Sequence, residues 1–402
     1  MKTNNTASAE LKPGLGRELG TLLKNNVRDY VMYIALIAIF IFFGIMTKGR
    51  FLSPRNLSDL INQTAYVAVL AIGMTLILIV RHIDLSVGYV AGFLGALSAM
   101  LLSNGLPVYV VIPVILLGGV VVGLYQGTLV SRVKVPAFVT TLAGMFIFRG
   151  LLSMVTASTG TIIVRDETFK ALNSGFLPDF MPVENGIHKL TIAIGIIAVV
   201  LMVASQLNSR RQLQRYQFKV NSLPIFIGQL VLFSAIIAAF ILMLASYKGL
   251  PWAAAIVGVV LFIYNFLLNK TRLGRSIYGI GGNPEAAELS GINVRKVTLL
   301  VFASMSMLAA LSGMLFTSRM ASATPQAGLG FELDAIASSY IGGVSVSGGI
   351  GKVTNTIIGA LVIMSLTNGM NLMGVDISVQ YVVKGVIFII AVAFDVITRG
   401  KR

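Results

Sequence analysis

The chain has 402 residues, of which 56% are hydrophobic and 11% are charged, with a mean hydropathy of +0.87. A soluble globular chain carries roughly twice that charged fraction, so the composition excludes this class and indicates an all-α, polytopic membrane protein. Cysteine is absent and histidine occurs twice, which excludes disulfides and thiolate sites, while the net charge of +16 leaves nucleic acid as a partner to be tested.

The apolar runs of the sequence are long enough to span a membrane. They predict twelve helical spans, at 30–47, 64–80, 86–103, 107–130, 136–156, 190–205, 224–245, 252–268, 297–317, 333–350, 353–372 and 379–397. Of these, 190–205 is short and 333–350 is rich in Gly and Ser. Residues 1–29 are polar and no small-residue cleavage site follows the first apolar run, so we expect an uncleaved cytoplasmic segment before a transmembrane domain over 30–402.

The basic residues predict which side of the membrane is cytoplasmic. If the chain starts in the cytoplasm and each span crosses once, cytoplasmic segments hold 21 of the 31 Lys and Arg, and the opposite side holds eight. This asymmetry follows the positive-inside rule and predicts that both termini are cytoplasmic. Because the charges are scattered and no aromatic-interleaved module organises them, nucleic acid is not expected as a partner.

The stretch "RHIDLSVG" at 81–88 places His82 and Asp84 two residues apart before the third span. No nucleophile accompanies them, so capping of the following helix by Asp84 or Ser86 is the simpler interpretation. The small residues from Gly88 onward allow close packing between helices.

Two basic residues, Arg149 and Lys384, lie inside predicted spans. Intramembrane charges are costly and usually functional. We nevertheless favour a structural role, in which they pair with helix-end carbonyls or reach the membrane surface, over contact with a transported substrate. No carboxylate is predicted well inside a span, although Asp334 and Asp395 come nearest to membrane depth.

Three connecting segments have distinct compositions. The external segment 157–189 is polar and of the length of a small lid or docking surface, although a plain connection fits equally well. The cytoplasmic stretch 206–223 is basic and is expected to be a loop at the surface of anionic lipid. The stretch 345–354 lacks the spacing of a phosphate-binding loop, because Gly351–Lys352 is followed by valine, and we expect a tight turn.

The segment "GGNPEAAELSGINVRKV" (281–297) predicts a short polar helix with both ends specified. Asn283 is a good N-cap, Pro284 suits the first helical position, and Gly291 is placed to end the helix in a left-handed turn. Glu285 and Glu288 lie where a helix N-terminus favours negative charge. Such a helix either transmits force from a partner protein or rests on lipid, and its exposed acidic residues favour the protein partner over anionic headgroups.

The sequence resembles the permease subunits of bacterial monosaccharide ABC importers, nearest to the xylose and multiple-monosaccharide type. The similarity runs from about residue 50 to the C-terminus. It is carried by "IDLSVG" at 83–88, "VPAFVTTLAG" at 135–144, "TRLGRSIYGIGGNPEAAELSGINV" at 271–294 and "FELDAIASSYIGGVSVSGGIG" at 331–351. His82 departs from the glutamate that many relatives carry there, and we assign no role to this side chain.

The resemblance implies a type II-like permease core of ten helices in the bacterial inner membrane, plus an extra hairpin at 190–245. It implies that cytoplasmic ATPase subunits hold the coupling loop 269–297. It also implies that ATP and magnesium bind to those subunits and not to this chain. A soluble sugar-binding protein and a second permease subunit are the other expected partners. The residues expected to contact the ATPase are Asn283, Pro284, Glu285, Ala286, Ala287, Glu288, Leu289, Ser290 and Gly291.

Other functions remain open from the residues alone. An ABC permease for another small polar solute is the nearest alternative. An ion-coupled sugar carrier also fits twelve spans, but it requires titratable groups in the pathway. An intramembrane enzyme requires a nucleophile with a base, or a metal cluster, and the absence of cysteine argues against it.

Overall fold

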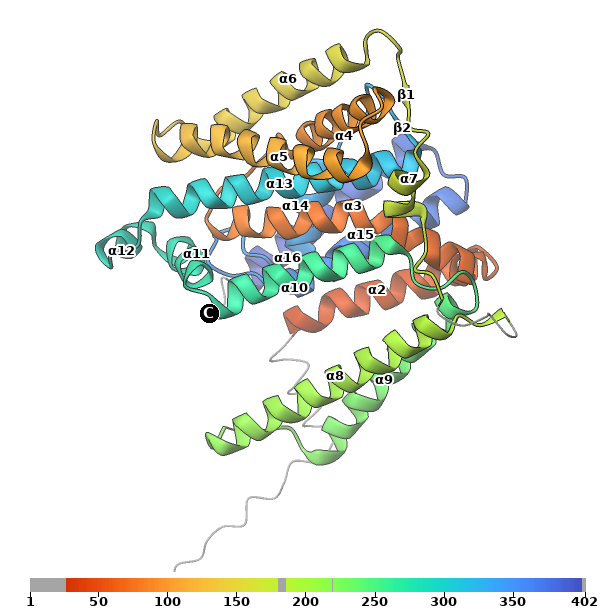
Figure 1. The fold of residues 1–402 in the computed structure, drawn as a ribbon. Coiled ribbons are helices and arrows are strands. Elements are labelled where there is room, and N and C mark those ends of the chain that lie inside the picture. The colour runs from red at the N-terminus through yellow and green to blue at the C-terminus, as the bar shows by residue number, and fades with distance from the viewer. Residues whose placement is uncertain (1–26, 180–185, 219, 400–402) are drawn as a thin grey trace, which may run out of the picture. The chain divides into compact units, whose positions relative to one another are not determined.

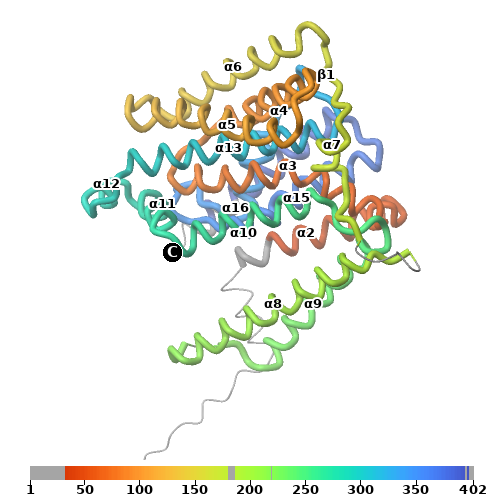
Figure 2. Tube along the Cα trace, viewed as in Figure 1, coloured from red at the N-terminus to blue at the C-terminus, as the bar shows by residue number. Residues whose placement is uncertain are grey.

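The computed structural model describes residues 27–179, 186–218 and 220–399. Most of the expected N-terminal segment 1–29 therefore lies outside the described residues. The described chain divides into two compact units, one containing residues 192–242 and a larger one containing 32–191 and 243–402. Figure 2 traces the path of the chain through both.

The larger unit is a helical bundle with α3 (Pro54–Ile79) and α13 (Val294–Met320) side by side at its centre (Figure 1). A helix that is apolar all round belongs in a core, and side chains along α3 such as Leu70 and Ile72 are fully buried. The surrounding helices are α2 (Val27–Met46), α4 (Val87–Ser103), α5 (Val108–Ser131), α6 (Ala137–Thr156), α10 (Trp252–Lys270), α14 (Phe331–Ile341), α15 (Val353–Leu372) and α16 (Ile377–Arg399).

Short elements mark the two ends of this bundle (Figure 1). At one end, β1 (Ile162–Ile163) pairs antiparallel with β2 (Ser322–Ala323), next to α7 (Glu167–Ser174). At the other end lie α11 (Arg272–Gly282) and α12 (Pro284–Leu289). A single turn, η1 (Arg50–Leu52), comes directly before α3 in the chain. We call these two ends the α7 end and the α12 end.

The packing of α4 confirms the close approach predicted from Gly88 onward. A Cβ on Gly92 would collide with the carbonyl oxygen of Ala327, and one on Gly95 would lie 2.7 Å from that of Gly313. Small residues therefore let α4 lie almost backbone to backbone against α13 and the segment before α14. Such packing is common where helices associate without a hydrophobic driving force between them.

Most of the predicted spans coincide with apolar helices. Among the described residues, eight helices are long and apolar enough to cross a membrane and three shorter apolar helices accompany them. Together these match every predicted span except 333–350, which is wrong as a continuous helix. There α14 ends at Ile341, and the chain continues through glycines with positive φ at 343, 348 and 349. The backbone at this bend is satisfied by Ser345 N–H to Ile350 and by Gly349 N–H to Ile79, as burial in protein requires.

The smaller unit is a helical hairpin made by α8 (Lys189–Arg215) and α9 (Leu223–Ala245), within the range predicted for an extra hairpin. The prediction of a basic loop over 206–223 is wrong for its first ten residues, because α8 continues to Arg215. The Arg210 guanidinium lies 4.6 Å from the centre of the Phe226 ring, so a charge of this stretch is held by an aromatic face.

The described part of 157–189 is packed against the bundle. Asp166 caps α7 by accepting a hydrogen bond from the Phe169 amide at 2.8 Å. Asn173, at the end of α7, donates to the Ser318 hydroxyl and to the carbonyl oxygen of Asn62. This segment therefore has its own elements and fixes the α7 end of α3 and α13.

Candidate functional site

The segment 269–297 folds as two consecutive helices, where the sequence analysis expected one. The second, α12, is the predicted helix: the Asn283 side-chain oxygen accepts from the Ala286 amide at 3.0 Å, and Pro284 takes the first position. Gly291 follows with φ of +83°, a left-handed conformation that costs glycine little. The sequence thus specified both ends of α12 correctly.

The residues predicted to meet the ATPase mostly face outward on α12. Ala287 is buried and Pro284 is half-buried, and these two anchor the helix. The other predicted residues are exposed, namely Asn283, Glu285, Ala286, Glu288, Leu289, Ser290 and Gly291. Leu289 is 91% exposed. An apolar side chain this exposed at the end of a short projecting helix is available for contact with a partner protein.

The preceding helix α11 connects α12 to the core of the bundle. Its C-terminal glycines meet the end of α3: Arg81 donates from Nε to the carbonyl oxygen of Gly281 at 2.7 Å, and from a terminal guanidinium nitrogen to that of Gly282. The Gly349 amide donates to the carbonyl oxygen of Ile79 at 2.9 Å. We call the residues Ile79, Arg81, Gly281, Gly282 and Gly349 the α3–α11 joint.

The joint is too close-packed for larger residues. A Cβ on Gly281 would collide with the carbonyl oxygen of Ile79 and lie 2.5 Å from the nitrogen of Gly349. A further bond ties α11 to the same loop, because the Tyr278 hydroxyl donates to the carbonyl oxygen of Gly351 at 2.7 Å. Burial raises the pKa of Tyr278 above its usual value of 10, so this phenol stays a donor at physiological pH.

The segment between α3 and α4 contains a buried polar cluster. Asp84 accepts from the Ser86 amide at 2.9 Å and from its hydroxyl at 2.6 Å, and Gln126 donates to the same hydroxyl. Ser86 occupies the N-cap position of α4, as predicted, although its side chain makes no capping hydrogen bond. Burial raises the pKa of Asp84 to about 6, against the lowering effect of its bonds to Ser86.

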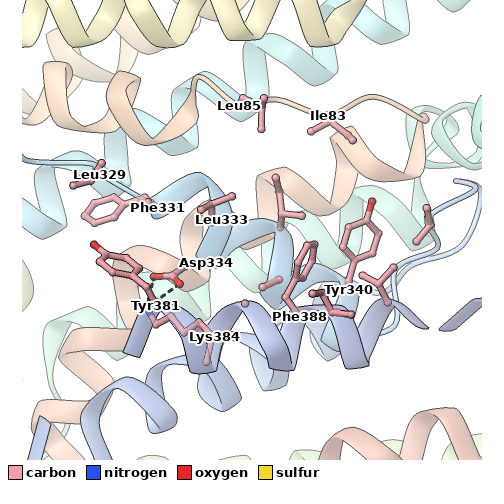
Figure 3. A pocket seen from close by; sticks show the side chains of 18 of the residues that line it. Ile83, Leu85, Leu329, Phe331, Leu333, Asp334, Tyr340, Tyr381, Lys384 and Phe388 are labelled. Atoms are coloured by element: carbon pink, nitrogen blue, oxygen red, sulfur yellow. Dashed lines mark hydrogen bonds and ion pairs between the residues drawn. The ribbon is translucent and has the colours of Figure 1, made fainter. Parts of the chain in front are cut away.

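A pocket lies between α14 and α16 in the larger unit (Figure 3). Its volume is about 780 Å³. The wall is mostly apolar and aromatic, and we call it the α14–α16 pocket. Residues from seven places in the chain line it, among them Tyr66, Ile83, Leu85, Phe138, Phe331, Asp334, Tyr340, Val346, Ile363, Tyr381, Lys384 and Phe388.

The sequence analysis expected Lys384 to pair with helix-end carbonyls or to reach the membrane surface. Its side chain does neither. Its Nζ lies 3.0 and 3.1 Å from the two carboxylate oxygens of Asp334 on α14 (Figure 3). The side chains of both residues are largely buried. The sequence analysis placed Asp334 near the edge of a span; it lies in the first turn of α14, largely buried against α16 and bonded to Lys384.

Arg149 has a different environment. It is exposed on α6, with its guanidinium carbon 5.8 Å from the centre of the Tyr89 ring. Arg149 does not line the α14–α16 pocket, and its structural role stays a prediction. The structure thus separates the two charges that the sequence had grouped together.

Arg81, Gly281, Asp334 and Tyr381 were not singled out as functional by the sequence analysis. Only the helical periodicity of 272–282 could have revealed α11, since Ile277 and Ile280 are buried on one face. The other features bring together residues far apart in the chain. Among the described residues, no three histidine, aspartate or glutamate side chains are grouped closely enough to hold a metal ion.

Comparison with known proteins gives a consistent result. The family described as branched-chain amino acid transport system / permease component matches residues 56–180 and 171–392. A xylose transport system permease protein from Haemophilus influenzae is 40% identical over 94% of this chain and 98% of its own length.

Two further relatives extend the comparison. The xylose transport system permease protein of Escherichia coli K12 is 36% identical over the full length of both chains. A ribose import permease protein from Haemophilus influenzae is 33% identical over 92% of each. No solved structure matches the chain.

Proposed function

The chain belongs to the permease family of ABC importers, in its monosaccharide group of xylose and ribose type, and from this premise we propose that it carries xylose or a closely related monosaccharide into the cell. It is a multi-pass inner-membrane transporter subunit and not an enzyme. Higher identity to the xylose permeases than to the ribose permease supports xylose as the first candidate.

The exposed tip of α12 carries the proposal that ATP drives transport. Family membership implies ATPase subunits as partners, and residues 283–291 form a capped helix whose Leu289 is almost fully exposed. We propose that the ATPase holds this helix, with Leu289 in an apolar recess and Glu285 and Glu288 at its rim. ATP and magnesium then act on the partner subunit.

Connectivity supports a cytoplasmic position for the α12 end. The chain alternates between the two ends of the bundle: α3 starts beside Asn173 at the α7 end and finishes at the α3–α11 joint. If α14 and the following loop to Gly351 count as one crossing, twelve crossings result, and the start of α2 and the end of α16 share the α12 end. The positive-inside rule makes that end cytoplasmic. The α7 end then faces the sugar-binding protein. A second copy of the permease is proposed to complete the pathway.

The joint supplies a path for force. When the ATPase moves α12, α11 moves with it, and Arg81 and Gly281 pass that displacement to the central helix α3. The loop at 345–351 follows, through the bonds of Gly349 and Tyr278. Packed interfaces of this kind switch between discrete arrangements instead of deforming smoothly. This arrangement fits alternating access of the sugar pathway.

The test is purification followed by reconstitution. The tagged protein, extracted in mild detergent, is expected to bring a near-stoichiometric ATPase with it. In liposomes the complex should import xylose with ATP and binding protein, without a proton gradient. The buried Asp334–Lys384 pair keeps an ion-coupled carrier as the second candidate, because such carriers need titratable groups in the pathway. Uptake by the permease alone, driven by a proton gradient, would establish that alternative.

A further inference from the structure

The α14–α16 pocket has the dimensions of a small-molecule site. Its volume of about 780 Å³ lies within the ~300–1,000 Å³ typical of ligand pockets. Such pockets combine apolar and aromatic walls with a few placed polar groups. Figure 3 shows this combination, with Asp334 and Lys384 meeting beside Tyr381 and Phe331.

The ion pair in this pocket has unused hydrogen-bonding capacity. Lys384 has three N–H groups and directs two contacts to Asp334. Its third N–H, and free lone pairs on the carboxylate, have no partner among the described residues. A hydroxyl group both donates and accepts, so it can bridge the two side chains without separating them.

The charge of the pair restricts the class of ligand. Together Asp334 and Lys384 are neutral, so neither an anion nor a cation finds an unpaired counter-charge in the pocket. A charged ligand must displace one partner and leave the other buried and unpaired, which is strongly unfavourable. An uncharged polyhydroxyl molecule avoids this cost.

Aromatic rings supply the second element of sugar recognition. Phe331 lies 4.8 Å from the Tyr66 ring, and Phe388 lies 6.0 Å from the Tyr340 ring. Tyr381 is half-exposed on α16 next to the ion pair. A pyranose has flat C–H faces and a rim of hydroxyls, so it matches rings beside a polar pair.

Two walls of the pocket also belong to segments held by the α3–α11 joint. Ile83 and Leu85 follow Arg81 within four residues, and Val346 precedes Gly349 by three. A displacement of α11 would therefore reach the backbone that carries these lining residues. The pocket is thus positioned to gain and lose its ligand as the ATPase cycles.

We propose that the α14–α16 pocket is a contact site for the monosaccharide in transit, where Asp334 and Lys384 jointly hydrogen-bond a sugar hydroxyl and Tyr381 contacts the ring. This inference rests on the proposed function, because it takes a monosaccharide as the solute. The binding protein selects the sugar outside the membrane, and the pocket receives it within the membrane domain.

The absence of cysteine makes a direct test practical. Gly385 lines the pocket, and a Cβ there meets no atom within 4 Å, so Gly385→Cys adds a thiol without disturbing the native groups. Gly150→Cys on α6 is the matched control, since it is equally open and lies outside the pocket. Both variants are labelled with a water-soluble maleimide in the assembled importer, with xylose, ribose or leucine added.

The expected result is slower labelling of Gly385→Cys by a sugar. At a sugar concentration about ten times its dissociation constant, labelling slows about tenfold, while Gly150→Cys is unaffected. The same variant carrying Asp334→Leu and Lys384→Met loses this protection, although an apolar replacement of both partners preserves folding. Tyr381→Ala weakens protection, measured as the ratio of the labelling rates without and with sugar in the same variant.

The other outcomes separate the site from the function. Equal labelling with and without sugar, in an importer that still transports that sugar, overturns the site and leaves the proposed function intact. Protection by leucine and not by sugars overturns the ligand class. If the wild-type complex shows no ATP-driven sugar uptake at all, the proposed function itself is wrong.

Discussion

Replacement of Arg81 by alanine tests whether the α3–α11 joint transmits force. The change removes two charge-assisted hydrogen bonds, to the carbonyl oxygens of Gly281 and Gly282. Arg81 has φ of +66°, and alanine keeps this backbone cost, so the substitution isolates the side chain. Glycine would relieve the backbone as well and confuse the comparison.

The magnitude follows from the position of the guanidinium. Hydrogen bonds to charged groups contribute about 1.5–3 kcal/mol each when buried, but Arg81 is solvent-exposed and screening reduces this. We therefore expect the docked arrangement of α11 to lose about 1–2 kcal/mol in total, which is about a five- to thirtyfold change in its population.

The assay is the number of sugar molecules imported per ATP hydrolysed in proteoliposomes that contain the full importer. Arg81→Ala is expected to lower this ratio at least severalfold while ATP hydrolysis persists. Arg81→Lys keeps the positive charge but lacks the planar guanidinium that bonds two carbonyl oxygens at once. Its ratio of sugar imported to ATP hydrolysed should therefore lie between those of Arg81→Ala and the wild type. The control is Arg132→Ala, because Arg132 is exposed at the end of α5.

A wild-type ratio in Arg81→Ala would refute this reasoning. So would an equal loss of hydrolysis and import together with a lower melting temperature, since that pattern reports folding and not coupling.

Three further predictions follow from the same geometry. Glu285→Arg should leave the protein inserted but abolish co-purification of the ATPase and sugar uptake, whereas the same charge change at Glu167, at the α7 end, should leave co-purification of the ATPase intact; normal uptake by Glu285→Arg would exclude α12 as the contact. Burial raises the pKa of Asp84 from 3.8 to about 6, so its contribution to stability is present below pH 3.8 and is lost as the pH rises through about 6, by an amount on the order of 3 kcal/mol. Asp84→Asn should therefore raise the melting temperature at pH 7.5 and not at pH 4. No gain in melting temperature at pH 7.5 would contradict this. Asp334→Asn alone should destabilise by about 3–5 kcal/mol, and adding Lys384→Met should recover much of the loss; additive losses in thermal unfolding would show that the pair is not coupled.

The sequence predicted the local structure of α12 because every signal involved is local. The cap at Asn283, the proline after it and the left-handed turn at Gly291 act within a few residues of one another. The amphipathic pattern of α11, with Ile277 and Ile280 buried on one face, is equally local. Hydrophobic length likewise predicted most spans without any tertiary information.

The one wrong span shows where local evidence ends. The composition of 333–350 is apolar enough for a helix, and its Gly and Ser content alone does not say where the helix stops. The stop at Ile341 depends on a partner: the loop is held by the bond of Gly349 to Ile79, which lies elsewhere in the chain. A buried irregular backbone is stable only where such partners exist.

By itself, the sequence determined that this is a helical membrane protein and that it contains a short capped helix. Only the tertiary structure decided which residues make up the joint and the pocket. Arg81 and Gly281 are 200 residues apart, and Asp334 and Lys384 are 50 apart. Neither pair leaves a periodic or motif signal, because each contact arises from helix packing and not from neighbouring residues.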